Sequence, residues 1–173
     1  MILFLDNYDS FSNNILKKIN LKNLILNLLN LNIKKINLNY FIEKIIIFGP
    51  GPGNIENSNL NTIIIDKFLG KKKFLGVCLG HQIISCYFGY KLYKLNIINH
   101  GELKKVVFYI KKYRLFIIKK FIFYNSLSCL GLNNFLILSK NNFEIFIIKN
   151  LFLKAKSFQF HSESIMSYRN ILL

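Results

Sequence analysis

Apolar runs of strand length alternate with amphipathic stretches through the first half of the chain. The runs are rich in Ile, Leu, Phe and Val and predict strands at residues 2–5, 24–29, 44–48 and 73–77, although Asn27 weakens the second. Capping residues and apolar spacing predict helices between them, at residues 11–20, 58–69 and 79–88. Residues 33–42 are ambiguous. Such alternation is typical of a parallel sheet with helices on both faces.

The pattern changes after Gly89 to short apolar runs with few helical stretches. These runs predict strands, many of them antiparallel, at residues 106–110, 121–124, 135–138, 143–148 and 156–160. A short helix is expected over 164–172. The expected fold is therefore α/β: a mostly parallel central sheet with flanking helices, plus a smaller antiparallel strand region in the second half. We expect one domain over residues 1–173, because no linker or repeat divides the chain.

The chain is strongly basic, with a formal net charge of +16, and 52% of its residues are hydrophobic. Such a charge favours nucleic-acid binding, and a cationic nucleic-acid-binding protein is a remote alternative that requires the lysines to form one face. The lysines are instead scattered in pairs among Ile, Asn and Leu, apart from one triplet at 71–73. This distribution indicates a compositional bias, so we expect no nucleic-acid partner.

No apolar run reaches the roughly 18–20 residues that span a bilayer, and the N-terminus has no basic segment before its apolar run. We therefore expect a cytoplasmic protein without a membrane partner. The three cysteines (Cys78, Cys86 and Cys129) have no zinc-site spacing and cannot all pair. Neither a disulfide framework nor a metal site is expected, and Cys86 and Cys129 are interpreted as core residues.

The segment 74–82 reads Phe-Leu-Gly-Val-Cys-Leu-Gly-His-Gln, a predicted strand that enters a helix through Gly-x-Cys-x-Gly. This is the pattern of a nucleophile elbow with Cys78 in the position of the nucleophile. The start of a helix favours the thiolate, which is the reactive form of cysteine. Near the other end of the sequence, Glu163 follows His161 by two residues, a spacing that allows the carboxylate to orient the imidazole. Together these residues predict a Cys-His-Glu triad.

Other uncommon residues have less specific interpretations. Both prolines lie in the loop Gly-Pro-Gly-Pro-Gly at 49–53, which predicts a rigid turn at the sheet edge that carries the elbow. Asp6 and Asp9 are expected to cap the following helix rather than to bind a metal. His81 and His100 are expected to be structural.

In these motifs the chain resembles the class I glutamine amidotransferases, and more narrowly the small subunits of anthranilate synthase and of aminodeoxychorismate synthase. The resemblance also includes Leu-Asp-Asn-Tyr-Asp-Ser-Phe at 5–11, His-Gly at 100–101, Tyr-Asn-Ser-Leu at 124–127 and Phe-Gln-Phe-His-Ser-Glu-Ser at 158–164. It implies a class I glutamine amidotransferase fold. Residues 102–123 and 131–155 match only in pattern.

The resemblance implies that Cys78 attacks the side-chain amide of glutamine, that His161 transfers protons and that Glu163 orients His161. Substrate and oxyanion contacts are implied for Gly51, Pro52, Gly53, Leu79, Gln82, Ser126 and Leu127. The released ammonia is implied to pass to a larger, chorismate-aminating synthase subunit, which binds the Mg²⁺; no cofactor or metal is expected in this chain. The loop at 49–53 favours the anthranilate (tryptophan) pathway over the aminodeoxychorismate (folate) pathway.

Three positions depart from the family pattern. Ser162 replaces a proline between the catalytic His and Glu, Asn125 replaces a histidine before Ser-Leu, and Glu102 replaces a lysine after His-Gly. They leave open a non-catalytic relative that only supports a synthase.

Overall fold

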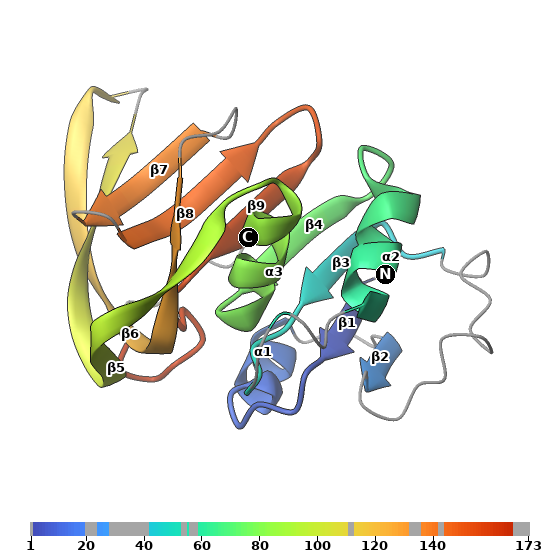
Figure 1. Cartoon of the computed structure of the whole chain (residues 1–173), viewed down its shortest axis with the longest axis horizontal. Helices are drawn as coiled ribbons and strands as arrows, with labels where there is room; N and C mark the ends of the chain where they lie inside the picture. The colour runs from blue at the N-terminus through green and yellow to red at the C-terminus, as the bar shows by residue number, and fades with distance from the viewer. Residues whose placement is uncertain are drawn as a thin grey trace.

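The fold is built on a central sheet whose strands follow the predicted apolar runs (Figure 1). The computed structural model describes residues 2–19, 24–27, 42–52, 55, 59–110, 113–131, 136–141 and 144–167, with only the backbone for 24–27, 59, 110 and 136. In chain order, the first half contains β1 (Ile2–Asp6), α1 (Ser12–Ile19), β2 (Leu24–Asn27), β3 (Ile45–Phe48), α2 (Asn59–Phe68), β4 (Lys73–Val77) and α3 (Leu79–Tyr87). The second half contains β5 (Lys91–Ile110), β6 (Leu115–Leu130), β7 (Leu136–Asn141), β8 (Glu144–Asn150) and β9 (Ala155–Phe158).

The central sheet has seven strands in the order β2-β1-β3-β4-β9-β8-β7. Its first five strands are parallel, and β8 and β7 extend it in antiparallel fashion. β4 therefore lies between β3 and β9, which places the start of α3 beside the chain that follows β9. The fold prediction of a mostly parallel sheet with flanking helices and a smaller antiparallel region is confirmed.

Two apolar clusters cover the two faces of this sheet. Because side chains alternate along a strand, β1 contributes Leu3 and Leu5 to one cluster and Ile2 and Phe4 to the other. The first cluster is closed by apolar residues of α2 and α3. The second is closed by Ile15 of α1 and by aromatic residues of β6, β8 and the segment after β9. Strands buried on both faces explain why the apolar runs of the first half are continuous.

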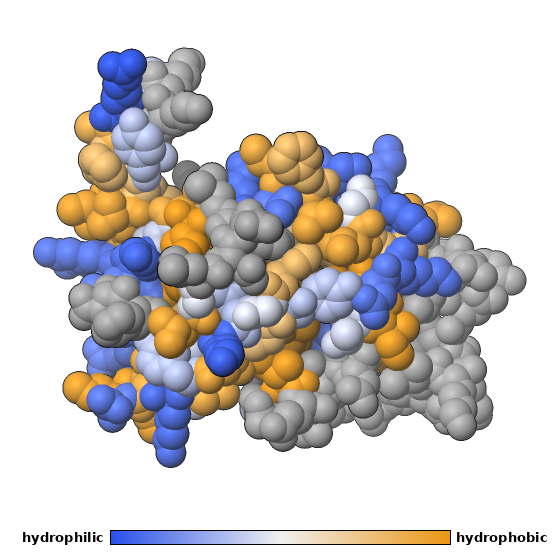
Figure 2. Space-filling model, turned by 45° about the horizontal axis from the view of Figure 1, so that its top comes forward, coloured by the Kyte–Doolittle hydropathy of each residue, from blue (hydrophilic) through white to orange (hydrophobic). Residues whose placement is uncertain are grey.

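β5 and β6 form a separate two-stranded antiparallel ribbon, which curves past β7 and β8 (Figure 1). The ion pair between Lys104 and Glu144 Oε1, 3.0 Å apart, joins β5 to β8. The ribbon presents exposed apolar side chains, among them Val107, Tyr109, Phe116 and Ile118. On the face drawn in Figure 2, hydrophilic and apolar side chains are interspersed rather than segregated. Within the part of the chain that the structure describes, no helix has the length and apolar character needed to cross a membrane.

Several predicted boundaries differ from the structure. The runs at 106–110 and 121–124 cover only parts of the 20-residue β5 and the 16-residue β6. Lysine and asparagine occupy many positions of these strands, so apolar content alone does not mark their ends. A helix over 164–172 was expected, but residues 164–167 form turns and 168–173 lie outside the described residues. Residues 33–41 of the ambiguous stretch and Ser58 lie outside them too.

Candidate active site

Cys78 lies at a sharp turn between β4 and α3. Its backbone has φ 52° and ψ −104°, a conformation that costs energy for any residue except glycine, and its N–H donates to Phe158 O at 2.9 Å. The turn needs its two glycines because the backbone segments touch. A Cβ on Gly80 would lie 2.0 Å from Phe48 O, and one on Gly76 would lie 2.5 Å from Gly80 O. The predicted elbow is therefore present, with the sulfur at the N-terminal end of α3.

A small cavity of about 180 Å³ opens beside Cys78. It is lined by Gly51, Pro52, Cys78, Leu79, Gln82, Tyr124, Asn125, Ser126 and Leu127. Thus six of the seven residues predicted to contact substrate or oxyanion share one cavity with the candidate nucleophile. The seventh, Gly53, lies outside the described residues.

Polar side chains fix the floor of this cavity. Gln82 Nε2 donates to Leu127 O at 3.0 Å and to Gln159 Oε1 at 3.3 Å. Gln159 Nε2 in turn donates to Cys78 Sγ at 3.9 Å, a long contact of the kind that sulfur acceptors allow. Because both N–H donors of Gln82 are used within the protein, its amide oxygen is the group that it can offer to a ligand.

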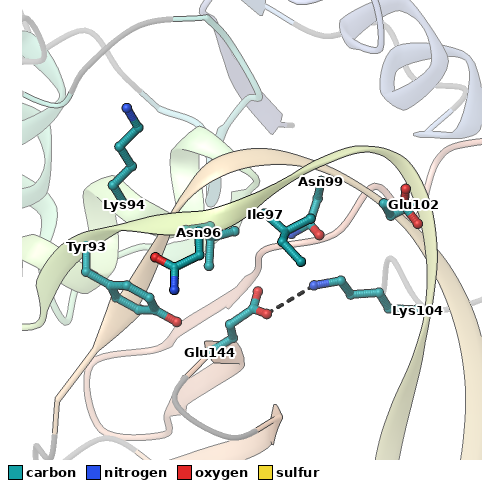
Figure 3. A pocket seen from close by; sticks show the side chains of 9 residues that line it. Tyr93, Lys94, Asn96, Ile97, Asn99, Glu102, Lys104 and Glu144 are labelled. Carbon is teal, nitrogen blue, oxygen red and sulfur yellow. Dashed lines mark hydrogen bonds and ion pairs between the residues drawn. The ribbon is translucent and has the colours of Figure 1, made fainter.

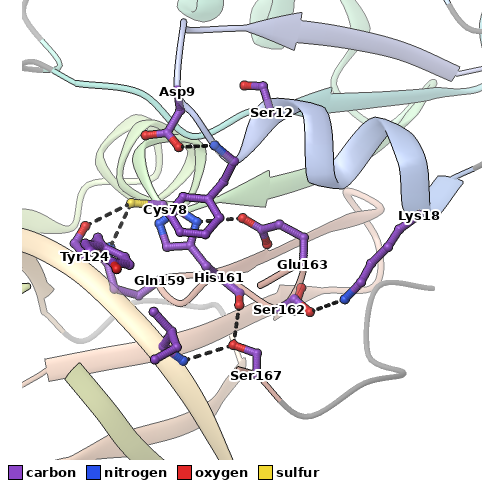
Figure 4. A network of polar contacts seen from close by, with 12 residues as sticks. Asp9, Ser12, Lys18, Cys78, Tyr124, Gln159, His161, Ser162, Glu163 and Ser167 are labelled. Atoms are coloured by element: carbon purple, nitrogen blue, oxygen red, sulfur yellow. Dashed lines mark hydrogen bonds and ion pairs between the residues drawn. The ribbon is translucent and has the colours of Figure 1, made fainter. Parts of the chain in front are cut away.

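His161 and Glu163 form a buried pair next to Cys78 (Figure 4). His161 Nδ1 lies 2.6 Å from Glu163 Oε1, and both side chains are at most 1% exposed. Burial lowers the pKa of His161, but the neighbouring Cys78 sulfur and Glu163 carboxylate outweigh it and raise the pKa to about 10. His161 Nε2 makes no hydrogen bond of normal length with the described residues. The Cys78 sulfur and the Glu163 carboxylate therefore both favour the protonated form of the imidazole.

Aromatic rings hold the imidazole in place. The ring of Phe11 packs on His161 with centroids 4.5 Å apart, and Tyr124 meets it edge-on at 5.8 Å. Tyr124 also lines the cavity, and its carbonyl oxygen lies 3.5 Å from Cys78 Sγ. The structure therefore brings Cys78, His161 and Glu163 together, although His161 and Glu163 do not line the cavity itself.

The sequence motifs contained further site residues to which no role was assigned. Tyr124 and Asn125 precede Ser126 in a motif of the family resemblance, and Gln159 lies two residues before His161. Asn125 Oδ1 accepts from Asn99 at 3.0 Å, and its Nδ2 donates to Leu127 O at 3.0 Å. These two hydrogen bonds hold Asn125 in place in the wall of the cavity. Their positions within the motifs could have identified these residues as part of the site, because tyrosine, asparagine and glutamine are not distinctive residue types by themselves.

The remaining histidines and cysteines have structural surroundings. His81 is fully buried and bridges Ser157 Oγ at 2.8 Å and Ile145 O at 3.1 Å, and burial lowers its pKa to about 4. His100 is exposed and packs edge-on against Tyr124. Burial raises the pKa of Cys86, and raises that of Cys129 to about 12. Both thiols are therefore protonated at neutral pH and poor nucleophiles.

Asp6 and Asp9 hold the loop before α1. Asp6 Oδ1 accepts from Ser12 Oγ at 2.7 Å and from the Tyr8 N–H at 2.9 Å, and Asp9 Oδ1 accepts from the Phe11 N–H at 2.8 Å. These bonds order the loop that leads into α1, as expected for the two aspartates, and Phe11, whose N–H bonds to Asp9, packs its ring on His161. No cluster of three or more metal-binding side chains is found among the described residues.

A second, larger hollow of about 590 Å³ lies against β5, lined by residues that include Lys94, Asn99, Glu102, Lys104 and Glu144 (Figure 3). The Lys104–Glu144 ion pair crosses it. None of the three triad candidates lines this hollow, so it is separate from the cavity beside Cys78.

Comparisons with known proteins identify the family of this chain. The family model described as glutamine amidotransferase class-I matches residues 3–171. Among solved structures, a putative GMP synthase component from Thermoplasma acidophilum is similar with a TM-score of 0.74 at 17% identity, over 96% of this chain and 85% of that one. A glutamine amidotransferase from Thermotoga maritima has a TM-score of 0.68 at 16% identity, over 94% and 75% of the two chains. At these identities the two structures support the fold alone.

Curated relatives named anthranilate synthase component 2 are similar in sequence. The protein from Buchnera aphidicola subsp. Schizaphis graminum is 31% identical over 99% of this chain and 91% of its own length. Matches to the proteins from Cyanidium caldarium (36% identity) and Cyanophora paradoxa (44%) cover 68% and 59% of this chain, and only 60% and 54% of those relatives. With a family model that matches nearly the whole chain, this protein belongs to the class I glutamine amidotransferases.

Proposed function

We propose that this protein is the glutaminase subunit of an anthranilate synthase, which releases ammonia from glutamine for a larger subunit that aminates chorismate. The observation that carries the proposal is that Cys78, on a strained turn, lines the same small cavity as the residues implied to bind glutamine. The near-full-length similarity to a protein named anthranilate synthase component 2 supports the choice of pathway.

The chemistry follows from the charge state of the buried pair. The Cys78 thiol passes its proton to Nε2 of His161, and the Cys78 sulfur and the Glu163 carboxylate favour this transfer because they raise the pKa of the imidazole. The sulfur then attacks the side-chain amide carbon of glutamine. We assign the stabilisation of the developing oxyanion to the backbone N–H of Leu79, in the first turn of α3, and to a glycine N–H of the segment 51–53, as the family resemblance implies.

Collapse of this intermediate breaks the C–N bond. His161 donates its proton to the departing ammonia, and Cys78 is left as a γ-glutamyl thioester. His161 then removes a proton from a water molecule that attacks the thioester, and glutamate is released. Glu163 keeps the imidazole in the orientation needed for both proton transfers, through the 2.6 Å contact at Nδ1.

The test is glutamate release from glutamine by the purified chain, with and without a co-expressed chorismate-aminating subunit. Turnover is expected to rise with the partner and to disappear in Cys78→Ala, while the Cys78→Ala complex still makes the aminated product from added ammonia. Cys129→Ala is the matched control, because its thiol is buried away from the cavity.

The product identifies the pathway. Anthranilate supports the proposal, whereas aminodeoxychorismate assigns the chain to the folate pathway. A folded complex that uses ammonia but never glutamine contradicts a glutaminase role and leaves a supporting subunit. Loss of both activities in Cys78→Ala contradicts the role assigned to Cys78.

A further inference from the structure

We propose that Lys18 is a positioning residue, which holds the His161–Ser162–Glu163 segment in its active geometry from helix α1. The inference rests on the proposed glutaminase function. Lys18 Nζ donates a hydrogen bond to the carbonyl oxygen of Ser162 at 2.6 Å, across 144 residues of sequence (Figure 4). The acceptor is the peptide carbonyl between the two triad candidates.

The segment is held on each side by a different element. The His161 N–H donates to Ile122 O of β6 at 2.9 Å, and the His161 carbonyl accepts from Ser167 Oγ. Ser167 Oγ also accepts from the Ile122 N–H at 3.0 Å. These contacts fix the histidine to the ribbon, and Lys18 fixes the next peptide to α1. A charged donor makes a stronger hydrogen bond than a neutral one, so Lys18 is suited to this restraint.

The residue at position 162 explains why a restraint is needed. A proline at 162, as the family resemblance implies, fixes its own φ, whereas serine does not. Ser162 is buried, but its hydroxyl has no hydrogen-bond partner among the described residues. The hydroxyl therefore does not hold the segment, and the restraint acts on the backbone carbonyl instead.

The test compares Lys18→Met with Lys17→Met, a neighbouring exposed lysine on the same helix. In the partnered complex, Lys18→Met is expected to lower kcat for glutamine about tenfold or more, with KM little changed, because a misplaced general acid slows proton transfer. Alkylation of Cys78 by iodoacetamide at neutral pH should slow as well, since the His161 imidazolium no longer faces the sulfur correctly. Lys17→Met should change neither, and Lys18→Arg should restore most of both.

A double-mutant cycle with Ser162→Pro makes the test specific. We expect Ser162→Pro alone to be tolerated, and the Lys18→Met penalty to shrink in its presence, because the proline ring restrains the same backbone. Equal Lys18→Met penalties with serine and with proline at position 162, or equal effects of the two lysine variants, overturn the proposal.

The alkylation rate separates this proposal from the proposed function. If the wild-type complex releases no glutamate but Lys18→Met still slows Cys78 alkylation, the glutaminase assignment fails and the positioning role stands. If glutamine is hydrolysed and Lys18→Met behaves like wild type in both measurements, the reverse holds.

Discussion

At the scale of single residues, the site depends on charge pairing in a buried place. His161 and Glu163 are almost fully buried, so neither charge is screened well by water, and each is stabilised by the other. The exposed Lys17 and Lys18 show that neighbouring residues of one type can differ in role, because Lys18 is the one that contacts the segment around the triad. The role of a residue therefore depends more on the group that it contacts than on its residue type.

Glu163→Gln should reveal this pairing through the pH dependence of stability. The pKa of His161 rises from 6.5 to about 10 on folding, so its contribution is fully present below pH 6.5 and is lost as the pH approaches 10. In Glu163→Gln that pKa falls. The wild type should therefore exceed the variant in unfolding free energy by about 2 kcal/mol near pH 6 and by much less near pH 10. Urea denaturation at several pH values measures the difference.

Glu102→Gln, at an exposed position on the ribbon, serves as the control and should track the wild type across this range. A wild-type advantage over Glu163→Gln that is equally large at both pH values would show that the imidazolium does not depend on the carboxylate. Glutamine turnover of Glu163→Gln should fall by about a hundredfold.

The residues of the elbow and the triad were predictable because few residue types perform nucleophilic catalysis and their spacing is narrow. Lys18 and Gln159 were not, although both contact the triad residues or the segment that carries them. The Lys18 contact joins residues 144 positions apart, and lysine is the commonest charged residue type of this chain. No local pattern distinguishes a lysine that reaches across the fold from one that points into solvent.

At the scale of elements, the elbow depends on how closely α3 approaches β3. Gly80→Ala should destabilise the fold by about 3 kcal/mol or more, because the added Cβ would lie 2.0 Å from the Phe48 carbonyl oxygen. Gly70→Ala is the matched control, since its φ of +71° is strained for alanine but nothing lies within 4 Å of the added Cβ. It should cost about 1–2 kcal/mol.

Thermal unfolding of both variants measures these costs. Similar losses for Gly70→Ala and Gly80→Ala would mean that β3 shifts to accommodate the added Cβ at position 80 and that the close approach costs little. The strand–helix order was predictable here because strands buried on both faces give unbroken apolar runs. The lengths of β5 and β6 were not, because lysine and asparagine interrupt the apolar runs of a ribbon that has one solvent-facing side.

At the scale of the whole molecule, the charge of +16 is spread over a chain of 173 residues. Like charges repel one another in the folded state, and salt screens this repulsion with a Debye length of about 10 Å at 0.1 M. We expect the midpoint of thermal unfolding to rise by roughly 3–6 °C, or ~1–2 kcal/mol, between low salt and about 0.3 M NaCl. Differential scanning calorimetry measures the change.

Choline chloride at the same ionic strength is the control, because screening does not depend on the cation. A midpoint that stays constant or falls with salt would mean that ion pairs such as Lys104–Glu144 offset the repulsion. The overall charge was readable from the sequence, but the interspersion of hydrophilic and apolar side chains on the face drawn in Figure 2 depends on the folded arrangement.

The pairing of β4 with β9 also sets the order in which the protein becomes active during synthesis. The Cys78 N–H bonds to Phe158 O, and His161 follows three residues later, so two neighbouring strands that are far apart in the sequence bring the proposed nucleophile and its proposed base together. When the segment around Cys78 has emerged from the ribosome, β9, the strand that pairs with β4, has not yet emerged. The Cys78 thiol can therefore meet His161 only after β9 has left the exit tunnel, so unfinished chains lack the histidine that is proposed to accept its proton.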